Sequence, residues 1–247
     1  MTVAPNIRNT YSSEGDRSLI DRQSSLFIEL AAKRFSYALK QTDGGIFTGD
    51  YRFQEAPDEA VYRTELRAIF AKDELLQRSY PACFAVVHST FELVPAPFFN
   101  AASLPVASKY AVVNDVVVVY QEPAVLADLG LSAITVKPGA QLLLMEHQKN
   151  GSHVLVLEDG FYVMMVRNNG IQLMNFYPYQ SVADFMYFLL AAARDCDFDR
   201  QNDPVYVYGM VASNSAIADR IHQFFGNVQF MKRSQLFVFN QLMLCAS

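Results

Sequence analysis

One pattern of strands occurs twice along this chain of 247 residues. Residues 25–53 and residues 152–177 each contain three consecutive short apolar runs separated by tight-turn signals, among them Gly44-Gly45, Asp159-Gly160 and Asn168-Asn169-Gly170. Asp-Gly and Asn-Gly favour hairpins because these residues tolerate the positive φ that such turns require. Each half therefore begins with a predicted three-stranded antiparallel meander.

After each meander the sequence predicts the same order of helix, strand, helix, strand and helix. Asp58 is the expected N-cap of the first of these helices, and Ser181 with Asp184 forms a predicted capping box for its counterpart. The expected elements that follow are residues 116–120, 123–129, 133–136 and 139–148 in the first half, and residues 205–211, 215–225, 227–231 and 235–244 in the second. Strands that alternate with helices pair in parallel through right-handed crossovers.

This repetition predicts an α/β protein made of two related domains. Residues 1–23 are polar and lack apolar periodicity, so a mobile N-terminal tail is expected there. The first domain is predicted over residues 24–150, with an insertion at about 80–112 that contains a hairpin over residues 84–94, and the second over residues 151–247. A polar, glycine-containing link at residues 149–152 marks the boundary.

Composition narrows the class of protein. The residues are 51% hydrophobic, which suits packed cores, and the net charge of −5 with no basic block argues against nucleic acid as a partner. The apolar windows are too short to span a bilayer, and the first residues do not resemble a signal peptide. Three cysteines without a CxxC pair fit a reducing compartment, so a cytoplasmic location without membrane insertion is expected.

Three segments carry a resemblance to a known family: the strand at residues 26–30, the run Phe91-Glu92-Leu93-Val94-Pro95, and the end of the second meander at Asn175-Phe176. With the duplicated order of elements, the chain resembles a bacterial family of unknown function that has the actin-like ATPase fold. The resemblance implies duplicated ribonuclease H-like domains (βββαβαβα) in an actin-like arrangement. More distantly, the chain is similar to the cytoplasmic actin-like components of type IV pilus and type II secretion assemblies, which are recruitment scaffolds.

The resemblance also implies where ATP and Mg²⁺ would bind, between one hairpin turn of each domain. Glu29 stands where the usual acidic residue precedes the first turn, but the glycine and hydroxyl positions that follow it are Leu or Ala. Asp159 and Gly160 keep an acidic-glycine pair in the second turn, and Gly209 is a single glycine where two are usual. These four residues are the candidate nucleotide site. Each also has a plain structural explanation. Glu29 can be an ordinary strand carboxylate, Asp159-Gly160 an ordinary hairpin turn, and Gly209 a close-packing glycine at a strand end.

No other pattern predicts a catalytic or metal-binding residue. The segment Asp195-Cys196-Asp197-Phe198-Asp199 imitates the start of a calcium loop, but the turn glycine and final glutamate are missing. The histidines lack metal-ligand spacing. Aromatic and proline residues in and near the insertion form a candidate apolar surface for a peptide or a second subunit.

Three functions follow from these observations. The first is a non-catalytic cytoplasmic binding or scaffold protein with degraded phosphate loops and an unidentified protein or peptide partner. The second is an ATP-binding switch with altered phosphate motifs. The third is a metal-dependent nuclease, because ribonuclease H-like domains can carry converging carboxylates.

Overall fold

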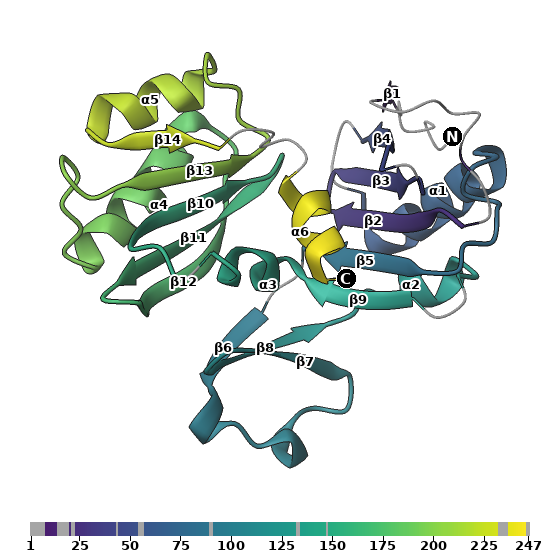
Figure 1. The fold of residues 1–247 in the computed structure, drawn as a ribbon, viewed down its shortest axis with the longest axis horizontal. Helices are drawn as coiled ribbons and strands as arrows, with labels where there is room; N and C mark the ends of the chain where they lie inside the picture. Colours follow the sequence, from purple (N-terminus) through teal and green to yellow (C-terminus); the bar gives the residue numbers. More distant parts are fainter. Residues whose placement is uncertain are drawn as a thin grey trace.

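The chain forms two α/β domains that stand side by side, with a small third sheet beneath them (Figure 1). The computed structural model describes residues 8–13, 20, 23–42, 44–53, 57–88, 91–131, 134–146, 148–231 and 237–245.

The first sheet is mixed. Its six strands run in the order β1 (Arg8–Ser13), β4 (Ile46–Arg52), β3 (Arg34–Lys40), β2 (Ser25–Ala31), β5 (Cys83–Val87) and β9 (Ile134–Pro138). The pairs β1–β4, β4–β3 and β3–β2 are antiparallel, whereas β2–β5 and β5–β9 are parallel.

The second sheet repeats this arrangement without a counterpart of β1. Its order is β12 (Gly170–Pro178), β11 (Gly160–Arg167), β10 (Gly151–Val156), β13 (Val205–Gly209) and β14 (Val228–Phe230). The pairs within the meander are antiparallel and the pairs β10–β13 and β13–β14 are parallel. The predicted duplication of an actin-like, ribonuclease H-like fold is therefore confirmed.

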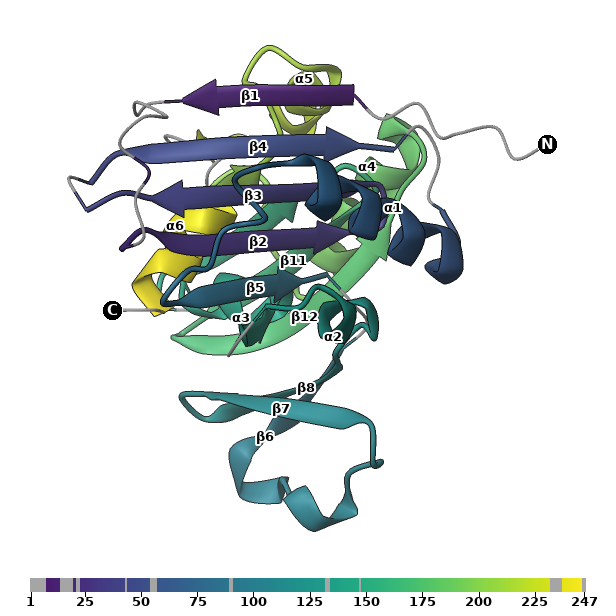
Figure 2. The ribbon, with the colours of Figure 1, turned by 90° about the vertical axis from the view of Figure 1, so that its right-hand side faces the viewer.

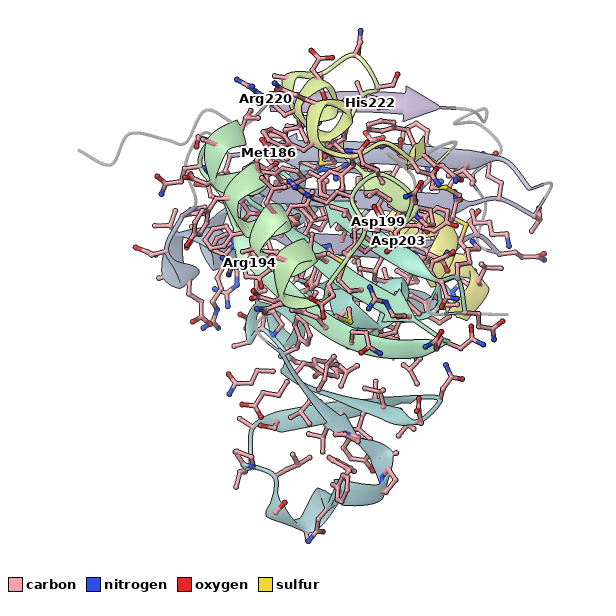
Figure 3. All side chains as sticks on the ribbon, turned by 90° about the vertical axis from the view of Figure 1, so that its left-hand side faces the viewer. Met186, Arg194, Asp199, Asp203, Arg220 and His222 are labelled. Carbon is pink, nitrogen blue, oxygen red and sulfur yellow. The ribbon has the colours of Figure 1, made fainter. Side chains whose placement is uncertain are left out.

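Helices lie on both faces of each sheet. They are α1 (Glu59–Lys72), α2 (Val125–Asp128), α3 (Gly139–Leu144), α4 (Val182–Asp195), α5 (Ala216–Phe224) and α6 (Phe237–Cys245). Figure 2 shows α1 and α2 on the outer face of the first sheet. Figure 3 shows α4, which carries Met186 and Arg194, and α5, which carries His222, on the outer face of the second sheet.

The predicted helix starts are confirmed. The Asp58 carboxylate accepts a hydrogen bond from the Val61 amide, and Ser181 and Asp184 form a reciprocal capping box. Such caps stabilise a helix because its first amides have no partner within the helix. The buried faces of these helices, which include Leu66 on α1 and Leu189 on α4, pack into the outer cores of their domains.

A third core fills the space between the domains. It joins side chains of both sheets with those of α3 and α6: Phe27, Val86, Leu142, Leu155, Tyr208 and Phe239 are buried members. Helix α6 follows the second sheet in sequence, yet it packs against β2 and β5 of the first as well as against β13 (Figure 1). Burial of this apolar surface therefore holds the two domains together.

The insertion differs from its prediction. Residues 84–94 do not form a hairpin, because β5 joins the first sheet beside β2 and only β6 (Phe91–Pro95) belongs to the insertion. The run at residues 116–120, expected in the main sheet, lies in β8 (Val116–Gln121), the central strand of the inserted sheet, between β6 and β7 (Ser108–Val113). Short β-branched runs look alike in sequence whichever sheet they join, so the local pattern did not specify the partner.

The N-terminal segment also differs from its prediction. Residues 1–23 were expected to be a mobile tail, but Arg8–Ser13 pairs antiparallel with β4 over its whole length. A polar edge strand lacks the alternation of apolar and polar residues that marks a half-buried strand, so the local sequence pattern did not predict this strand. Residues 1–7, 14–19, 21 and 22 lie outside the described part of the chain.

None of the helices formed by the described residues is long and apolar enough to cross a membrane.

Candidate functional site

The turns that were compared with phosphate loops meet at the boundary between the two domains. The Arg34 guanidinium lies 3.1 Å from the Glu29 carboxylate and 3.2 Å from the sulfur of Met210, the residue that follows Gly209. In the second hairpin turn, the carboxylate of Glu158, the residue before Asp159, lies 4.0 Å from Arg52 of the first domain. The structure thus brings Glu29, Asp159 and Gly209 to one region, here called the cleft.

Glu29 is the deeply buried member of this group, with 2% of its surface exposed. Its Oε2 accepts hydrogen bonds from Ser36 Oγ at 2.9 Å and Arg34 Nη1 at 3.1 Å, while His88 Nε2 lies 3.1 Å from its Oε1. Burial by itself raises the pKa of Glu29, but the guanidinium of Arg34, together with His88 and Ser36, lowers it to about 2. Glu29 is therefore a buried carboxylate with three donors from its own domain.

Arg34 neutralises two carboxylates at once. It begins β3 directly after the first hairpin turn, and its Nε donates to Asp50 Oδ1 while its Nη1 donates to Glu29. Burial lowers the pKa of Arg34, but the charges of Glu29 and Asp50 raise it above its ordinary value. Behind this turn, the Tyr62 hydroxyl donates towards the Ala31 and Arg34 carbonyl oxygens at 3.0 and 3.2 Å. The first turn is thus fixed in place from both sides.

His88 connects Glu29 to the second domain. It follows β5, and its Nδ1 lies 3.3 Å from the hydroxyl of Tyr162 on β11. Burial raises the pKa of Tyr162, so this hydroxyl stays protonated. A Cβ added at Gly139, the first residue of α3, would lie 2.3 Å from His88 Nδ1 and 2.8 Å from the Tyr162 hydroxyl. Only a glycine lets α3 approach this pair so closely.

The second hairpin turn, at Glu158 and Asp159, is acidic and more exposed than Glu29. The Glu158 side chain is 30% exposed and lies 4.0 Å from Arg52, which in turn donates to Asp50 at 2.9 Å. Burial raises the pKa of Glu158 despite the nearby arginines. Asp159, the next residue, forms the second hairpin turn, and its carbonyl accepts a hydrogen bond from Tyr179.

The two candidate glycines have geometric reasons to be glycine. Gly209 has a φ of +89°, and an added Cβ would lie 2.1 Å from the Val156 carbonyl oxygen. A Cβ at Gly160 would lie 2.2 Å from the Phe176 ring. Both therefore fit the structural explanation given from the sequence, in which a tight turn and a close approach require them.

Sequence reasoning missed the residues that contact Glu29. Arg34 stands directly after the first hairpin turn, at a position that the glycine and hydroxyl pattern of a phosphate loop does not include. His88 and Tyr162 lie 59 and 133 positions beyond Glu29, so no local pattern connects them with it. A buried strand carboxylate followed five residues later by an arginine across a hairpin was the one available signal.

A nuclease would need converging carboxylates on the meanders, for which the sequence offers Glu29, Asp50 and Glu158 or Asp159, and the first two are engaged by arginines. Asp50 accepts from both Arg34 and Arg52, and Glu29 accepts from Arg34. Among the residues that the structure describes, no cluster of three or more His, Cys, Asp or Glu side chains has the geometry of a metal site. Two-metal chemistry needs carboxylates that can turn towards metal ions, which these ion pairs oppose.

The calcium-like segment is a self-satisfied loop after α4. Figure 3 shows Asp199 and Asp203 close together in this loop. The Asp203 carboxylate accepts a hydrogen bond from the Asp199 amide, and the Asp199 carboxylate accepts from Gln201 and Asn202. These local bonds explain the spacing of its acidic residues.

Comparison with solved structures places this geometry in a known fold. A protein of Bacteroides thetaiotaomicron with an actin-like ATPase fold and unknown function superposes with a TM-score of 0.73 at 15% identity, over 91% of this chain and 96% of that one. The type IV pilus biogenesis complex of PilM and PilN gives 0.54 at 12%, over 91% and 99%. MreB 5 of Spiroplasma citri, bound to AMPPNP, gives 0.51 at 6%, over 91% and 96%. At these identities the likeness shows the fold alone.

No curated protein matches the sequence. The family described as "Protein of unknown function (DUF3822)" matches residues 17–124 and 136–228, which include both meanders and the whole inserted sheet. The chain, with its two actin-like domains and its arginine-filled cleft, belongs to the DUF3822 family.

Proposed function

We propose that this protein is a non-catalytic cytoplasmic binding or scaffold protein, built on an actin-like fold whose cleft is filled by its own side chains. The observation that carries the proposal is the Arg34 guanidinium. It follows the first hairpin turn, pairs with Glu29 and Asp50, and contacts Met210 of the second domain. A cation in this position neutralises the acidic residues that would otherwise order the water shell of Mg²⁺.

The contacts between the domains support the same proposal. Domain closure around a ligand needs a boundary that opens. Here Arg34 contacts Met210 and His88 contacts Tyr162 across the boundary, above an apolar core shared by both sheets. Opening would expose that core to water and separate the polar contacts. The core and these contacts therefore stabilise the closed arrangement without nucleotide. PilM, which resembles this chain in fold, is found in a complex with PilN, which is consistent with a partner-binding role for the fold.

Thermal unfolding with and without millimolar Mg²⁺-ATP tests the proposal. Nucleotide at 100 times its Kd would add about 2.7 kcal/mol to the free energy of unfolding. For a chain of this size, that stabilisation raises Tm by about 5–11 °C. We expect no rise. A rise of this size, saturating with nucleotide concentration, would overturn the proposal.

The second candidate is an ATP-binding switch with altered phosphate motifs. The observation in its favour is the pair of acidic residues in the second turn, Glu158 and Asp159, of which Glu158 reaches the Arg34 network only through Arg52 at 4.0 Å. If this candidate is correct, Asp159→Asn weakens nucleotide binding, whereas Asp184→Asn on the far face of the second sheet leaves it unchanged. Equal affinities for wild type and Asp159→Asn would remove Asp159 from the site.

A further inference from the structure

The inserted sheet presents apolar side chains to solvent. Phe98 is 82% exposed and Val112 58%, and Val106 and Tyr110 are also exposed. In Figure 1 this sheet projects below the two domains. Exposed aromatic and aliphatic side chains gathered on one element mark an interaction surface.

The register of the strands shows which face carries this surface. Directly opposed residues of antiparallel strands share a face. The pairs Leu93↔Val118 and Ala111↔Val118 place one face against the body, since Leu93, Val118 and Ala111 belong to the cores there. The pairs Glu92↔Val119 and Tyr110↔Val119 define the opposite face, which contains the exposed Tyr110.

A groove of about 430 Å³ lies on this outer face. Its floor is the sheet, and its wall is formed by the two short 3-10 turns, η2 (Ala96–Phe98) and η3 (Ala101–Ser103), with the residues that follow them. The Phe99 and Tyr110 rings pack 4.8 Å apart and fix the wall to the floor. The lining includes Val94, Phe98, Phe99, Leu104 and Val119. A groove of this volume holds two or three side chains of a peptide.

Polar side chains line the groove beside the apolar ones: Glu92, Asn100, Ser103, Ser108 and Gln121. Glu92 is the acidic residue of this lining. Glu92 is exposed, and no ion pair or hydrogen bond of its carboxylate is found among the described residues. The inserted strands and their turns carry one basic residue, Lys109, which the register places on the opposite face, beside Tyr120. The groove therefore offers a negative charge beside apolar side chains, among them the exposed Phe98 and the floor residue Val119.

We propose that this groove binds an extended peptide segment of a partner protein, in which an aromatic or large aliphatic side chain enters the pocket and an adjacent Lys or Arg pairs with Glu92. This inference rests on the proposed binding function and names its site. A second copy of the chain is the less suitable occupant. A symmetric contact between two outer faces would give neither Glu92 a basic partner from the inserted strands, because their one basic residue, Lys109, lies on the opposite face.

The test is a selection of random heptapeptides displayed on phage against the immobilised full chain. Three targets are compared: wild type, Glu92→Lys, and the matched control Glu122→Lys, an exposed acid just beyond β8 that does not line the groove. Wild type and control are expected to enrich an aromatic or aliphatic residue next to Lys or Arg. Glu92→Lys is expected to enrich Asp or Glu at that position, because complementarity of charge then reverses.

Synthetic peptides of the enriched sequence are then titrated by fluorescence anisotropy. We expect about a tenfold weaker Kd for Glu92→Lys, the loss of one charge-assisted contact, and an unchanged Kd for Glu122→Lys. Phe98→Ala, which shortens an exposed wall residue, is expected to weaken binding while leaving Tm unchanged.

Three results would overturn the inference. The first is no enrichment over the support without protein, and the second is the same peptides with the same Kd for wild type and Glu92→Lys. The third is a dimer of the wild type in sedimentation that Glu92→Lys alters, which would assign the groove to a second copy. Stabilisation by Mg²⁺-ATP would instead overturn the proposed function and leave the peptide measurements standing.

Discussion

Replacement of Glu29 by Gln tests whether the cleft is a self-satisfied ion-pair network. Gln keeps the shape of the side chain and removes its charge, so Arg34 and His88 lose a partner at 3.1 Å while the packing is retained. Removing one member of a buried pair leaves the other charge without compensation. The variant is therefore expected to fold and to be less stable.

The magnitude follows from the pKa of Glu29, which falls from 4.5 to about 2 in the folded protein. Each unit of this difference corresponds to about 1.36 kcal/mol between the charged and neutral forms, so the charge contributes about 3 kcal/mol at neutral pH. The folded-state pKa is lowered, so this contribution is complete above pH 4.5 and is lost as the pH falls towards 2. The same linkage leaves less than half of this contribution at pH 3.

Urea unfolding of wild type and Glu29→Gln measures this difference, followed by tyrosine fluorescence because the chain has no tryptophan. At pH 7 the variant is expected to lose about 3 kcal/mol, equivalent to about 6–12 °C in Tm, and the gap is expected to close by more than half at pH 3. Glu122→Gln, an exposed glutamate, is the matched control and is expected to behave as wild type at both pH values. A variant as stable as wild type at pH 7, or a gap independent of pH, would refute the reasoning.

Three further substitutions test the packing around the cleft and the second domain. Gly139→Ala places a Cβ 2.3 Å from His88 Nδ1 and is expected to lower the free energy of unfolding by about 1–3 kcal/mol. The control is Gly170→Ala, whose Cβ meets nothing nearer than 3.5 Å and which is expected to leave Tm nearly unchanged. Equal Tm values for these two variants would contradict the close approach of α3. Gly209→Ala, at a φ of +89° and against a backbone oxygen, is expected to cost more than about 2 kcal/mol by urea unfolding, and a neutral result would contradict the backbone geometry there. Ser181→Ala removes one half of the α4 capping box and is expected to cost about 1 kcal/mol, with Ser181→Thr restoring most of the loss.

Much of the fold is local and could be predicted from the sequence. The turn at Asn168-Asn169 adopts the positive φ values of 52° and 60° that its residue types favour, and Asp58, Ser181 and Ser215 cap helices as their positions indicate. The repeated order of elements then constrains the topology, since parallel strands joined by helices have few arrangements. The candidate residues Glu29, Asp159 and Gly209 came from the resemblance to the actin-like family and not from local pattern, and their role as a nucleotide site stays a prediction.

The sequence by itself thus determined the duplicated meanders, the turns and the helix starts, since each depends on residues a few positions apart. Only the tertiary structure decided which sheet received the apolar runs of β5 and β8, and that the polar segment Arg8–Ser13 extends the first sheet. It alone decided that Arg34 enters the cleft and that His88 lies between Glu29 and Tyr162. Strand pairing and the burial of a charge depend on surfaces that meet only after distant segments have packed, and no local pattern carries that information.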